Sequence, residues 1–398
     1  MSEQIVTPRI RGFVCTTAHP EGCARMVDWQ IETARAGAPA EPPGGRLLVL
    51  GSSTGYGLAS RIAGAFRYGM GSLGVCYERP PTDRRTASAG WYNTHAFHVR
   101  AREAGLPAET LNGDAFSREL LEQVTDRLRA GLGPIDTLVY SLASPRRTDP
   151  ETGETYQSVL KTVGDPYRIQ SINLANGLIE PYDLEPASPA EIADTVAVMG
   201  GADLRRWVDA LLAADLLAPG ARVVAYSYLG PEVTWPVYRH GTIGRAKADL
   251  EVTCSSLDAR LREAIGGSCN VSINKSIVTQ ASAAIPAVPL YMSLLFDVMK
   301  ARGTHEGPIE QAIRLFDTHL APGRSPSTDA EGRIRLDDLE MAPEVQAEVM
   351  HLWNRVDDAL LAETGAFERF QRYFRELFGF DVPGLDYDRP VEVELPLT

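Results

Sequence analysis

Apolar runs alternate with amphipathic stretches along most of this chain. Helical spacing of apolar residues is clearest in 116–133 and 257–266. Nearly continuous apolar strands separated by amphipathic helices are typical of a parallel sheet covered on both faces. The pattern therefore predicts an α/β fold, a Rossmann-like doubly wound parallel sheet. The runs expected to form its strands are 46–51, 73–77, 135–144, 222–230 and 270–278.

Two segments depart from this alternation. Residues 150–200 are rich in turns and prolines, and we interpret them as an insertion over the substrate site. After residue 300 the chain is largely helical and includes the amphipathic stretch 345–363. We predict a single α/β domain, 1–398, with a dinucleotide-binding core at 46–300 and a helical C-terminal extension at 301–398.

Composition narrows the class of protein. The chain has 398 residues, of which 44% are hydrophobic and 23% charged, as in an ordinary soluble globular protein. A net charge of −13 argues against nucleic acid or an anionic membrane as the main partner. The longest apolar stretch, 283–296, is too short and too interrupted by proline to span a membrane. With no signal-peptide pattern and five scattered cysteines, we expect a cytoplasmic protein without a disulfide framework.

A glycine-rich turn follows the first predicted strand. Gly51 ends that strand, and Gly55 and Gly57 precede a helical pattern. Glycines allow a tight turn and let the backbone approach a pyrophosphate, whose charge the helix N-terminus stabilises. Because a strand precedes the turn and a helix follows it, we predict dinucleotide binding here.

Acidic residues follow the next strand-like runs. Glu78 can hydrogen-bond an adenosine ribose 2′-hydroxyl and repel a 2′-phosphate, which favours NAD. Arg84 and Arg85 lie close behind and leave a phosphate-binding alternative open. Asp114 is expected at the adenine edge, as a helix N-cap, or as both. Small side chains in 141–144 would let a cofactor press on the backbone there.

The candidate proton donor is Tyr238, nine residues before Lys247. On one helix that spacing would place the two side chains on opposite faces. Pro236 and Gly241 flank Tyr238 and disfavour helix, and Thr242 can N-cap a helix carrying Lys247. Tyr238 can then approach Lys247 from a loop, where a nearby ammonium favours tyrosinate and strengthens the tyrosine as an acid.

No metal site is predicted. His95 and His98 have helical spacing, but no cysteine or acidic ligand cluster accompanies them, so we interpret them as solvated helix histidines.

Many stretches in chain order, together with the spacing Tyr-x8-Lys, resemble one known family. These stretches are 11–23, 51–62, 89–93, 112–117, 139–154, 158–161, 195–201, 278–286 and 303–311. The chain resembles the trans-2-enoyl-CoA reductases and the related V-type enoyl-acyl-carrier-protein reductases. The resemblance implies an enlarged short-chain dehydrogenase/reductase fold, a monomer, and NADH as cofactor.

The resemblance also implies residue roles. Tyr238 would donate the proton, Lys247 would bind NAD, and Tyr228 would contact the thioester. Arg239 departs from the aromatic residue expected after the catalytic tyrosine, which affects the expected channel wall. The residues that would bind NAD are Gly51, Ser52, Ser53, Thr54, Gly55, Tyr56, Tyr77, Glu78, Asp114, Ala115, Leu142, Ala143, Lys247, Ile277, Val278 and Thr279.

The expected activity is NADH-dependent reduction of the trans-2 double bond of an enoyl-CoA or enoyl-acyl-carrier-protein thioester in fatty acid synthesis. The apolar stretch 283–296 would cover the acyl chain or form a buried core helix, and Arg146 and Arg147 would lie near the exit for the carrier or have a structural role. A short-chain-type carbonyl reductase and a non-catalytic NAD-binding regulator stay open as alternatives. The wide Tyr–Lys spacing argues against the first, and the presence of both residues argues against the second.

Overall fold

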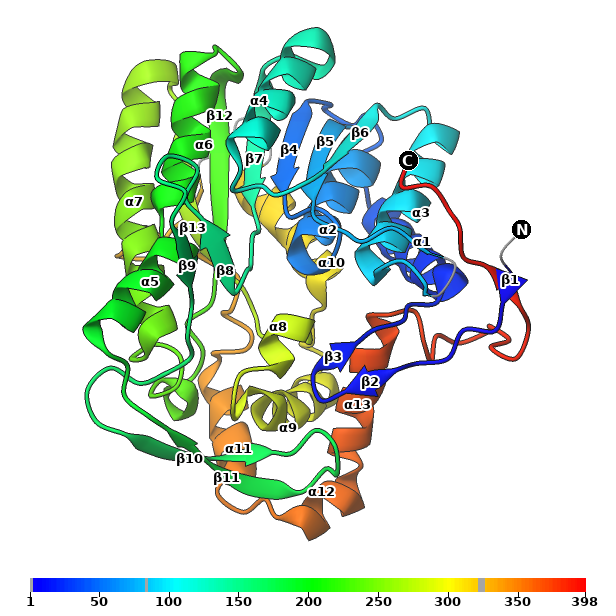
Figure 1. Ribbon diagram of the computed structural model, residues 1–398, viewed down its shortest axis with the longest axis vertical. Helices are drawn as coiled ribbons and strands as arrows, with labels where there is room; N and C mark the ends of the chain where they lie inside the picture. The colour runs from blue at the N-terminus through cyan, green and yellow to red at the C-terminus, as the bar shows by residue number, and fades with distance from the viewer. Residues whose placement is uncertain (1–2, 83–84, 321–325) are drawn as a thin grey trace.

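A seven-stranded parallel sheet forms the centre of the molecule (Figure 1). The structure, a computed structural model, describes residues 3–82, 85–320 and 326–398. The strands lie in the order β14–β13–β12–β7–β4–β5–β6, and every neighbouring pair is parallel. Their bounds are β4 Arg46–Leu50, β5 Gly71–Cys76, β6 Ala108–Asn112, β7 Ile135–Tyr140, β12 Leu217–Ser227, β13 Ser268–Ile273 and β14 Ile334–Arg335.

Helices cover both faces of this sheet, because its central strands are apolar on both sides. In β4, Leu47 and Val49 pack into one core, and Leu48 and Leu50 into the other. The first core is closed by α1 Pro20–Arg35, α2 Gly55–Ile62, α3 Ala89–Glu103 and α10 Pro308–Leu315. The second is closed by α4 Arg118–Arg127, α6 Ala202–Ala213 and α7 Thr242–Ile265. The predicted fold class, a doubly wound α/β sheet, is confirmed.

A third apolar core lies beyond the carboxyl ends of the strands, in the lower half of Figure 1. It is built from α9 Val288–Ala301, α11 Pro343–Trp353 and α13 Ala366–Glu376, with a hairpin of β10 Tyr167–Ile172 and β11 Ile179–Leu184 beside them. In the stretch 283–296, most side chains from Val288 onward are buried in this core. Only a few of them, including Val288 and Phe296, line a cavity.

Shorter elements complete the fold. The strands are β1 Glu3–Gln4, β2 Ile10–Arg11, β3 Val14–Cys15, β8 Arg146–Thr148, β9 Thr155–Gln157 and β15 Val391–Glu392. The helices are α5 Pro189–Met199, α8 Gln280–Ala283, α12 Asp358–Thr364, the π-helical turns Ala63–Arg67, Leu128–Leu132 and Phe316–Leu320, and the 3-10 turn Glu232–Thr234. β1 pairs with β15, so the two ends of the chain lie together (Figure 1). None of the described helices is long and apolar enough to cross a membrane.

The segment 150–200 packs beside the loop before α7. None of its residues lines the two cavities at the carboxyl ends of the strands. Instead α5 packs against α7, and the Lys161 carbonyl accepts the Thr242 N–H at 3.0 Å. The segment therefore supports the loop before α7 from outside the site. Its position over the substrate site stays a prediction.

The C-terminal extension is not only helical. β14 adds an edge strand to the sheet through Ser272 and Ile273 of β13, and the Leu336 N–H bonds to the Ile273 carbonyl at 2.8 Å. This pairing fixes the chain after Leu336 directly behind the loop that follows β13.

Candidate active site

A cavity of about 760 Å³ opens at the carboxyl ends of β4, β5, β7, β12 and β13. The chain order reverses between β4 and β7, and α/β sheets bind ligands at such a switch point. Most of the predicted site residues line this cavity: Gly51, Ser53, Thr54, Gly55, Tyr56, Tyr77, Glu78, Asp114, Ala115, Leu142, Ala143, Tyr228, Tyr238, Lys247, Ile277 and Thr279. Ser52 is fully buried with its hydroxyl on the Val75 carbonyl, and Val278 lines a neighbouring cavity.

The turn between β4 and α2 has the shape that a pyrophosphate requires. Gly51 has φ +86°, and a Cβ there would lie 2.2 Å from the Ser141 carbonyl oxygen. A Cβ on Gly57 would lie 1.9 Å from the Gly51 carbonyl oxygen. Only glycine fits both positions. Thr54 precedes α2 in an extended conformation, and the helix begins at the cavity wall, so its first N–H groups are available to an anion.

Glu78 is held in place by two serine hydroxyls. Ser53 donates to Glu78 Oε1 at 2.6 Å, Ser88 donates to Glu78 Oε2, and the Glu78 N–H donates to the Asn112 side chain at 2.7 Å. A Cβ on Gly90 would lie 2.1 Å from Glu78 Oε1, so the carboxylate is also confined by the start of α3. The arrangement fits a fixed acceptor for ribose hydroxyls. Of the phosphate-binding alternative, Arg84 lies outside the described residues and Arg85 is exposed.

Asp114 is not a helix N-cap. Ser117 caps α4 by accepting the Leu120 N–H at 3.1 Å, whereas Asp114 Oδ1 accepts the Phe116 N–H at 2.9 Å within the preceding turn. The expected N-cap role of Asp114 is therefore wrong. Asp114 does line the cavity, and its contact with adenine stays a prediction.

Tyr238 lies in a loop, and Lys247 lies on the helix that follows. The 3-10 turn Glu232–Thr234 ends before Tyr238, and the Tyr238 carbonyl accepts the Gly244 N–H at 3.0 Å, which folds the loop onto the start of α7. The N-cap of α7 is Gly241, not Thr242. Thr242 is the first helical residue and donates its hydroxyl to the Val159 carbonyl at 2.5 Å. The predicted cap is thus displaced by one residue.

Lys247 reaches the cavity from the second turn of α7. Its ammonium group lies 3.5 Å from the Tyr226 carbonyl. Burial lowers the pKa of Lys247 to about 8, with smaller opposing effects from Cys254 and Glu251. A bound anionic ligand would stabilise the charged form.

The two tyrosines of the site differ in what their hydroxyls contact. Their rings meet edge to face at 5.2 Å between centroids. The Tyr228 hydroxyl lies 3.1 Å from Glu340 Oε1. The Tyr238 hydroxyl makes no hydrogen bond to the residues described, and burial raises the pKa of Tyr238. Tyr238 therefore keeps its proton at neutral pH and can offer it to a ligand.

Arg239 does not alter the cavity wall. Its side chain is exposed and lies over the Trp235 ring at 4.6 Å. Arg147 is likewise structural: it is buried, donates to the Ala197 carbonyl at 2.8 Å and pairs with Asp149 at 3.5 Å. Arg146 lines the cavity, so only one member of the predicted basic pair faces it.

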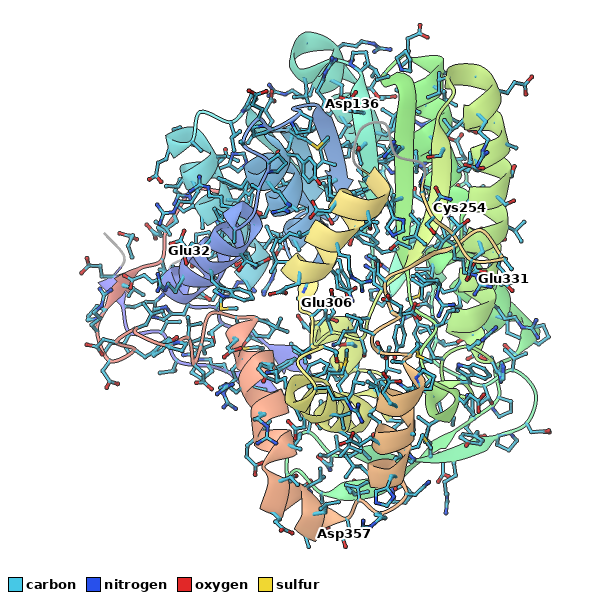
Figure 2. The ribbon with its side chains drawn as sticks, turned by 180° about the vertical axis from the view of Figure 1, so that it is seen from behind. Glu32, Asp136, Cys254, Glu306, Glu331 and Asp357 are labelled. Carbon is cyan, nitrogen blue, oxygen red and sulfur yellow. The ribbon has the colours of Figure 1, made fainter. Side chains whose placement is uncertain are left out.

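A second cavity, of about 1100 Å³, adjoins the first behind the glycine-rich turn. Thr54, Gly55, Glu78, Ile277, Thr279 and Gln280 line both cavities. Its far walls come from α1, from the start of α10 and from α13, and Figure 2 shows Glu32 and Glu306 from two of these walls. Met26, Trp29, Phe296, Tyr373 and Phe378 give it apolar surface. The two cavities together offer room for a dinucleotide and a long acyl thioester.

The described residues contain no group of three His, Cys, Asp or Glu side chains placed to hold a metal ion. The interpretation of His98 as a solvated histidine is wrong, because His98 is buried and its Nε2 lies 2.7 Å from the Thr110 hydroxyl.

Comparison with known proteins identifies the family. A model of the trans-2-enoyl-CoA reductase catalytic region matches residues 85–321, a model of the NAD(P)H-binding domain of trans-2-enoyl-CoA reductase matches 5–83, and a model of an enoyl reductase FAD-binding domain matches 328–391. The chain belongs to the trans-2-enoyl-CoA reductase family. The resemblance found in the sequence is confirmed, and so is the nicotinamide dinucleotide as cofactor class.

Relatives named as enoyl reductases match from end to end. An enoyl-[acyl-carrier-protein] reductase [NADH] of Opitutus terrae is 52% identical over 99% of this chain and 100% of its own. One from Burkholderia pseudomallei is 52% identical over 98% of this chain and 97% of its own. The crystal structure of the Clostridium acetobutulicum trans-2-enoyl-CoA reductase with NADH superposes with a TM-score of 0.94 at 38% identity, over 99% of both chains. The Treponema denticola enzyme with NAD gives 0.91 at 42% identity, also over 99% of both.

The residues present fit NAD and give no second dinucleotide turn. The β4–α2 turn and Glu78 line the first cavity where phosphate and ribose contacts are predicted. Residues 328–391, all of which the structure describes, contain β14, three helices and the first residue of β15, but no strand that leads through glycines into a helix. This segment instead supplies Glu340 behind Tyr228 and one wall of the second cavity, so we assign it no flavin.

Proposed function

We propose that this chain uses Tyr238 and Lys247 to reduce the trans-2 double bond of an enoyl thioester. As a member of its family, the chain is an NADH-dependent enoyl reductase. The observation that carries the residue assignment is the contrast between the two tyrosines: Tyr238 has a free hydroxyl in the cavity, while that of Tyr228 is engaged by Glu340.

Each residue then has a defined task. NADH bound in the cavity supplies the hydride for Cβ of the enoyl thioester. Negative charge develops on the thioester oxygen, where the Tyr238 hydroxyl donates a hydrogen bond and then its proton. The resulting enol gains a proton at Cα and loses the one on oxygen, which gives the saturated acyl thioester. A preorganised donor of this kind typically lowers the barrier by about 3–4 kcal/mol. Lys247 holds the nicotinamide ribose and, as an ammonium, makes Tyr238 a stronger acid.

The carrier, the oligomeric state and the location belong to the proposal as well. Both coenzyme A and acyl carrier protein are thioester carriers among the relatives' names, and we propose that the chain accepts enoyl groups on either, as a cytoplasmic monomer.

The test is a set of NADH-oxidation assays followed by the absorbance of the reduced nicotinamide. Crotonyl-, octenoyl- and dodecenoyl-CoA should be reduced, and acetoacetyl-CoA and simple aldehydes should not. Efficient ketone reduction without crotonyl-CoA reduction would contradict the proposal, and no turnover with any enoyl thioester would favour a binding protein.

A further inference from the structure

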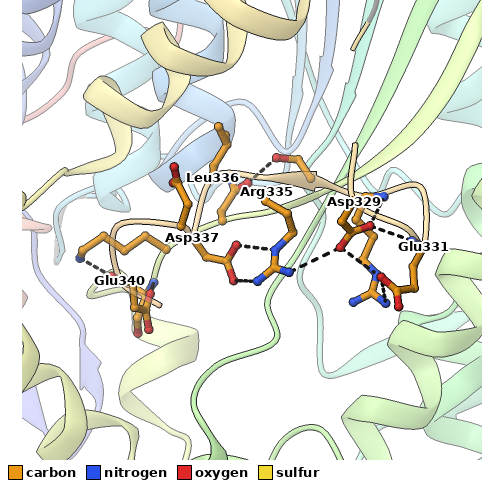
Figure 3. Close-up of polar contacts among 12 residues, drawn as sticks. Asp329, Glu331, Arg335, Leu336, Asp337 and Glu340 are labelled. Atoms are coloured by element: carbon orange, nitrogen blue, oxygen red, sulfur yellow. Dashed lines mark hydrogen bonds and ion pairs between the residues drawn. The ribbon is translucent and has the colours of Figure 1, made fainter. Parts of the chain in front are cut away.

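Behind Tyr228 lies a buried carboxyl group that no part of the dinucleotide core supplies. Glu340 is 0% exposed and comes from the loop after β14. The hydrogen bond from the Leu336 N–H to the Ile273 carbonyl holds that loop against the end of β13. The Arg335 guanidinium donates two hydrogen bonds, of 2.7 and 2.8 Å, to the Asp337 carboxylate (Figure 3). These bonds at Leu336 and Asp337 fix the loop just before Glu340 and so hold Glu340 in place.

Three groups converge on this carboxyl. The hydroxyls of Tyr228 and Tyr291 lie 3.1 and 2.9 Å from Oε1, and the Ser276 N–H donates to Oε2 at 2.6 Å. Gln346 donates to the Tyr291 hydroxyl at 3.0 Å and to the Glu340 carbonyl at 2.6 Å. The Tyr291 proton is thus directed to Glu340, because the tyrosine oxygen already accepts from Gln346.

Tyr228 has one proton, and its hydroxyl faces Glu340, the Ser276 side chain and the cavity. If Glu340 is a carboxylate, it takes that proton, and Tyr228 has none for a thioester. If Glu340 carries a proton, it can donate to the Tyr228 oxygen, and the Tyr228 proton turns to the cavity. Ser276 and Tyr291 remain satisfied in both cases, since each donates to an oxygen lone pair.

We propose that Glu340 is a positioning residue whose neutral carboxyl group holds the Tyr228 hydroxyl with its proton toward the thioester oxygen. The inference rests on the proposed contact between Tyr228 and the thioester. Glu340 touches neither substrate nor cofactor, and acts through Tyr228, whose ring packs on the ring of the proton donor Tyr238.

The charges around Glu340 decide how readily it holds this proton. Burial raises the pKa of Glu340 most strongly, and Asp337 raises it further. Lys275, the Ser276 N–H and the Tyr291 hydroxyl lower it. Tyr56, Tyr228 and Tyr291 are neutral, because burial raises the pKa of each hydroxyl.

The experiment is a double-mutant cycle in the full-length enzyme, with KM for crotonyl-CoA as the main readout. Glu340→Ala should raise KM by about tenfold or more when Tyr228 is present, and by less than about twofold in the Tyr228→Phe background. Glu340→Gln is made in a Tyr291→Phe background, because the Tyr291 proton would otherwise face the new amide. It should stay within about threefold of Tyr291→Phe alone, since its carbonyl can accept from Ser276 while its amide donates to Tyr228. Asp317→Asn is the control: it weakens the Arg67–Asp317 ion pair of 2.8 Å, whose residues line neither cavity, so it should lower Tm and leave KM alone.

Three results would overturn the inference. Equal effects of Glu340→Ala in both backgrounds would show a packing role, and a Glu340→Gln variant as impaired as Glu340→Ala would exclude the neutral carboxyl. A Tyr228→Phe enzyme with wild-type KM would overturn both this inference and the thioester contact, whereas the first two results leave the proposed function intact. If Glu340→Ala does not fold, the pH profile replaces it: wild-type KM should rise with pH as Glu340 loses its proton, and Glu340→Gln should abolish that rise.

Discussion

Replacing Tyr238 by phenylalanine tests the proposed chemistry with little effect on the fold. The ring stays, and with it the edge-to-face contact with Tyr228 at 5.2 Å between centroids. The deleted hydroxyl makes no hydrogen bond to the residues described, so its removal leaves no buried partner unsatisfied. We expect a change in unfolding free energy within about 0.5 kcal/mol, and Tm within about 2 °C.

The loss should fall on the chemical step. General acid catalysis is worth about 10²–10⁴ in rate, which corresponds to about 2.7–5.5 kcal/mol of barrier. Since the hydroxyl acts at the thioester oxygen, kcat should fall by that factor while the Kd for NADH changes by less than about twofold. The rate is measured by NADH oxidation with crotonyl-CoA, and Kd by quenching of NADH fluorescence.

Tyr228→Phe is the matched control, because it removes a hydroxyl from the neighbouring ring. It should mainly raise KM. A Tyr238→Phe enzyme with kcat within tenfold of wild type would refute the assignment and make Tyr228 the better candidate for the acid.

Three further predictions concern the cofactor side of the site. Gly51→Ala would place a Cβ 2.2 Å from the Ser141 carbonyl oxygen, at a residue with φ +86°. We expect either a Kd for NADH at least about tenfold higher or an unfolding free energy at least about 1 kcal/mol lower. Wild-type values in both the NADH titration and thermal melting would contradict this. Glu78→Ala should reduce the preference for NADH over NADPH, because the carboxylate held by Ser53 and Ser88 no longer repels a 2′-phosphate. The preference is measured as the ratio of the two kcat/KM values, and an unchanged ratio would show that Glu78 does not set it. Burial lowers the pKa of Lys247 to about 8, so its ammonium is present below that pH and lost above it; kcat/KM should fall as the pH rises through about 8, and a Lys247→Arg variant that still shows the fall would assign it to another group.

Local sequence rules predicted the parts of the site that depend on neighbouring residues. Pro236 and Gly241 were enough to place Tyr238 in a loop, because both disfavour helix. The strand-to-helix glycine turn was likewise readable from its glycine spacing, although only Gly57 is required by a contact within the same βα unit, whereas Gly51 is required by the Ser141 carbonyl after β7. The error at Thr242 arose from a distant partner: its hydroxyl bonds to the Val159 carbonyl rather than to its own helix.

Residues whose role depends on distant pairing could not be predicted. β14 has only two residues, too few to give an apolar pattern, yet its pairing with β13 places Glu340 behind Tyr228. His98 carried no sequence signal of burial, because its partner Thr110 lies on the edge strand β6. Arg147 was predicted at a carrier exit, but the Ala197 carbonyl fifty residues later engages it.

The attachment of β14 to the edge of the sheet has a consequence for how the enzyme is made. During translation the glycine-rich turn leaves the ribosome early. Tyr238 and the following helix α7, which carries Lys247, also leave it well before Glu340. The nascent chain can therefore assemble its NAD-binding half while Tyr228 still lacks the carboxyl group behind it. A chain truncated before β14 would keep the cofactor-binding turn but lack Glu340 behind the substrate-contacting Tyr228. The order of translation therefore separates the ability to bind the cofactor from the ability to reduce the substrate.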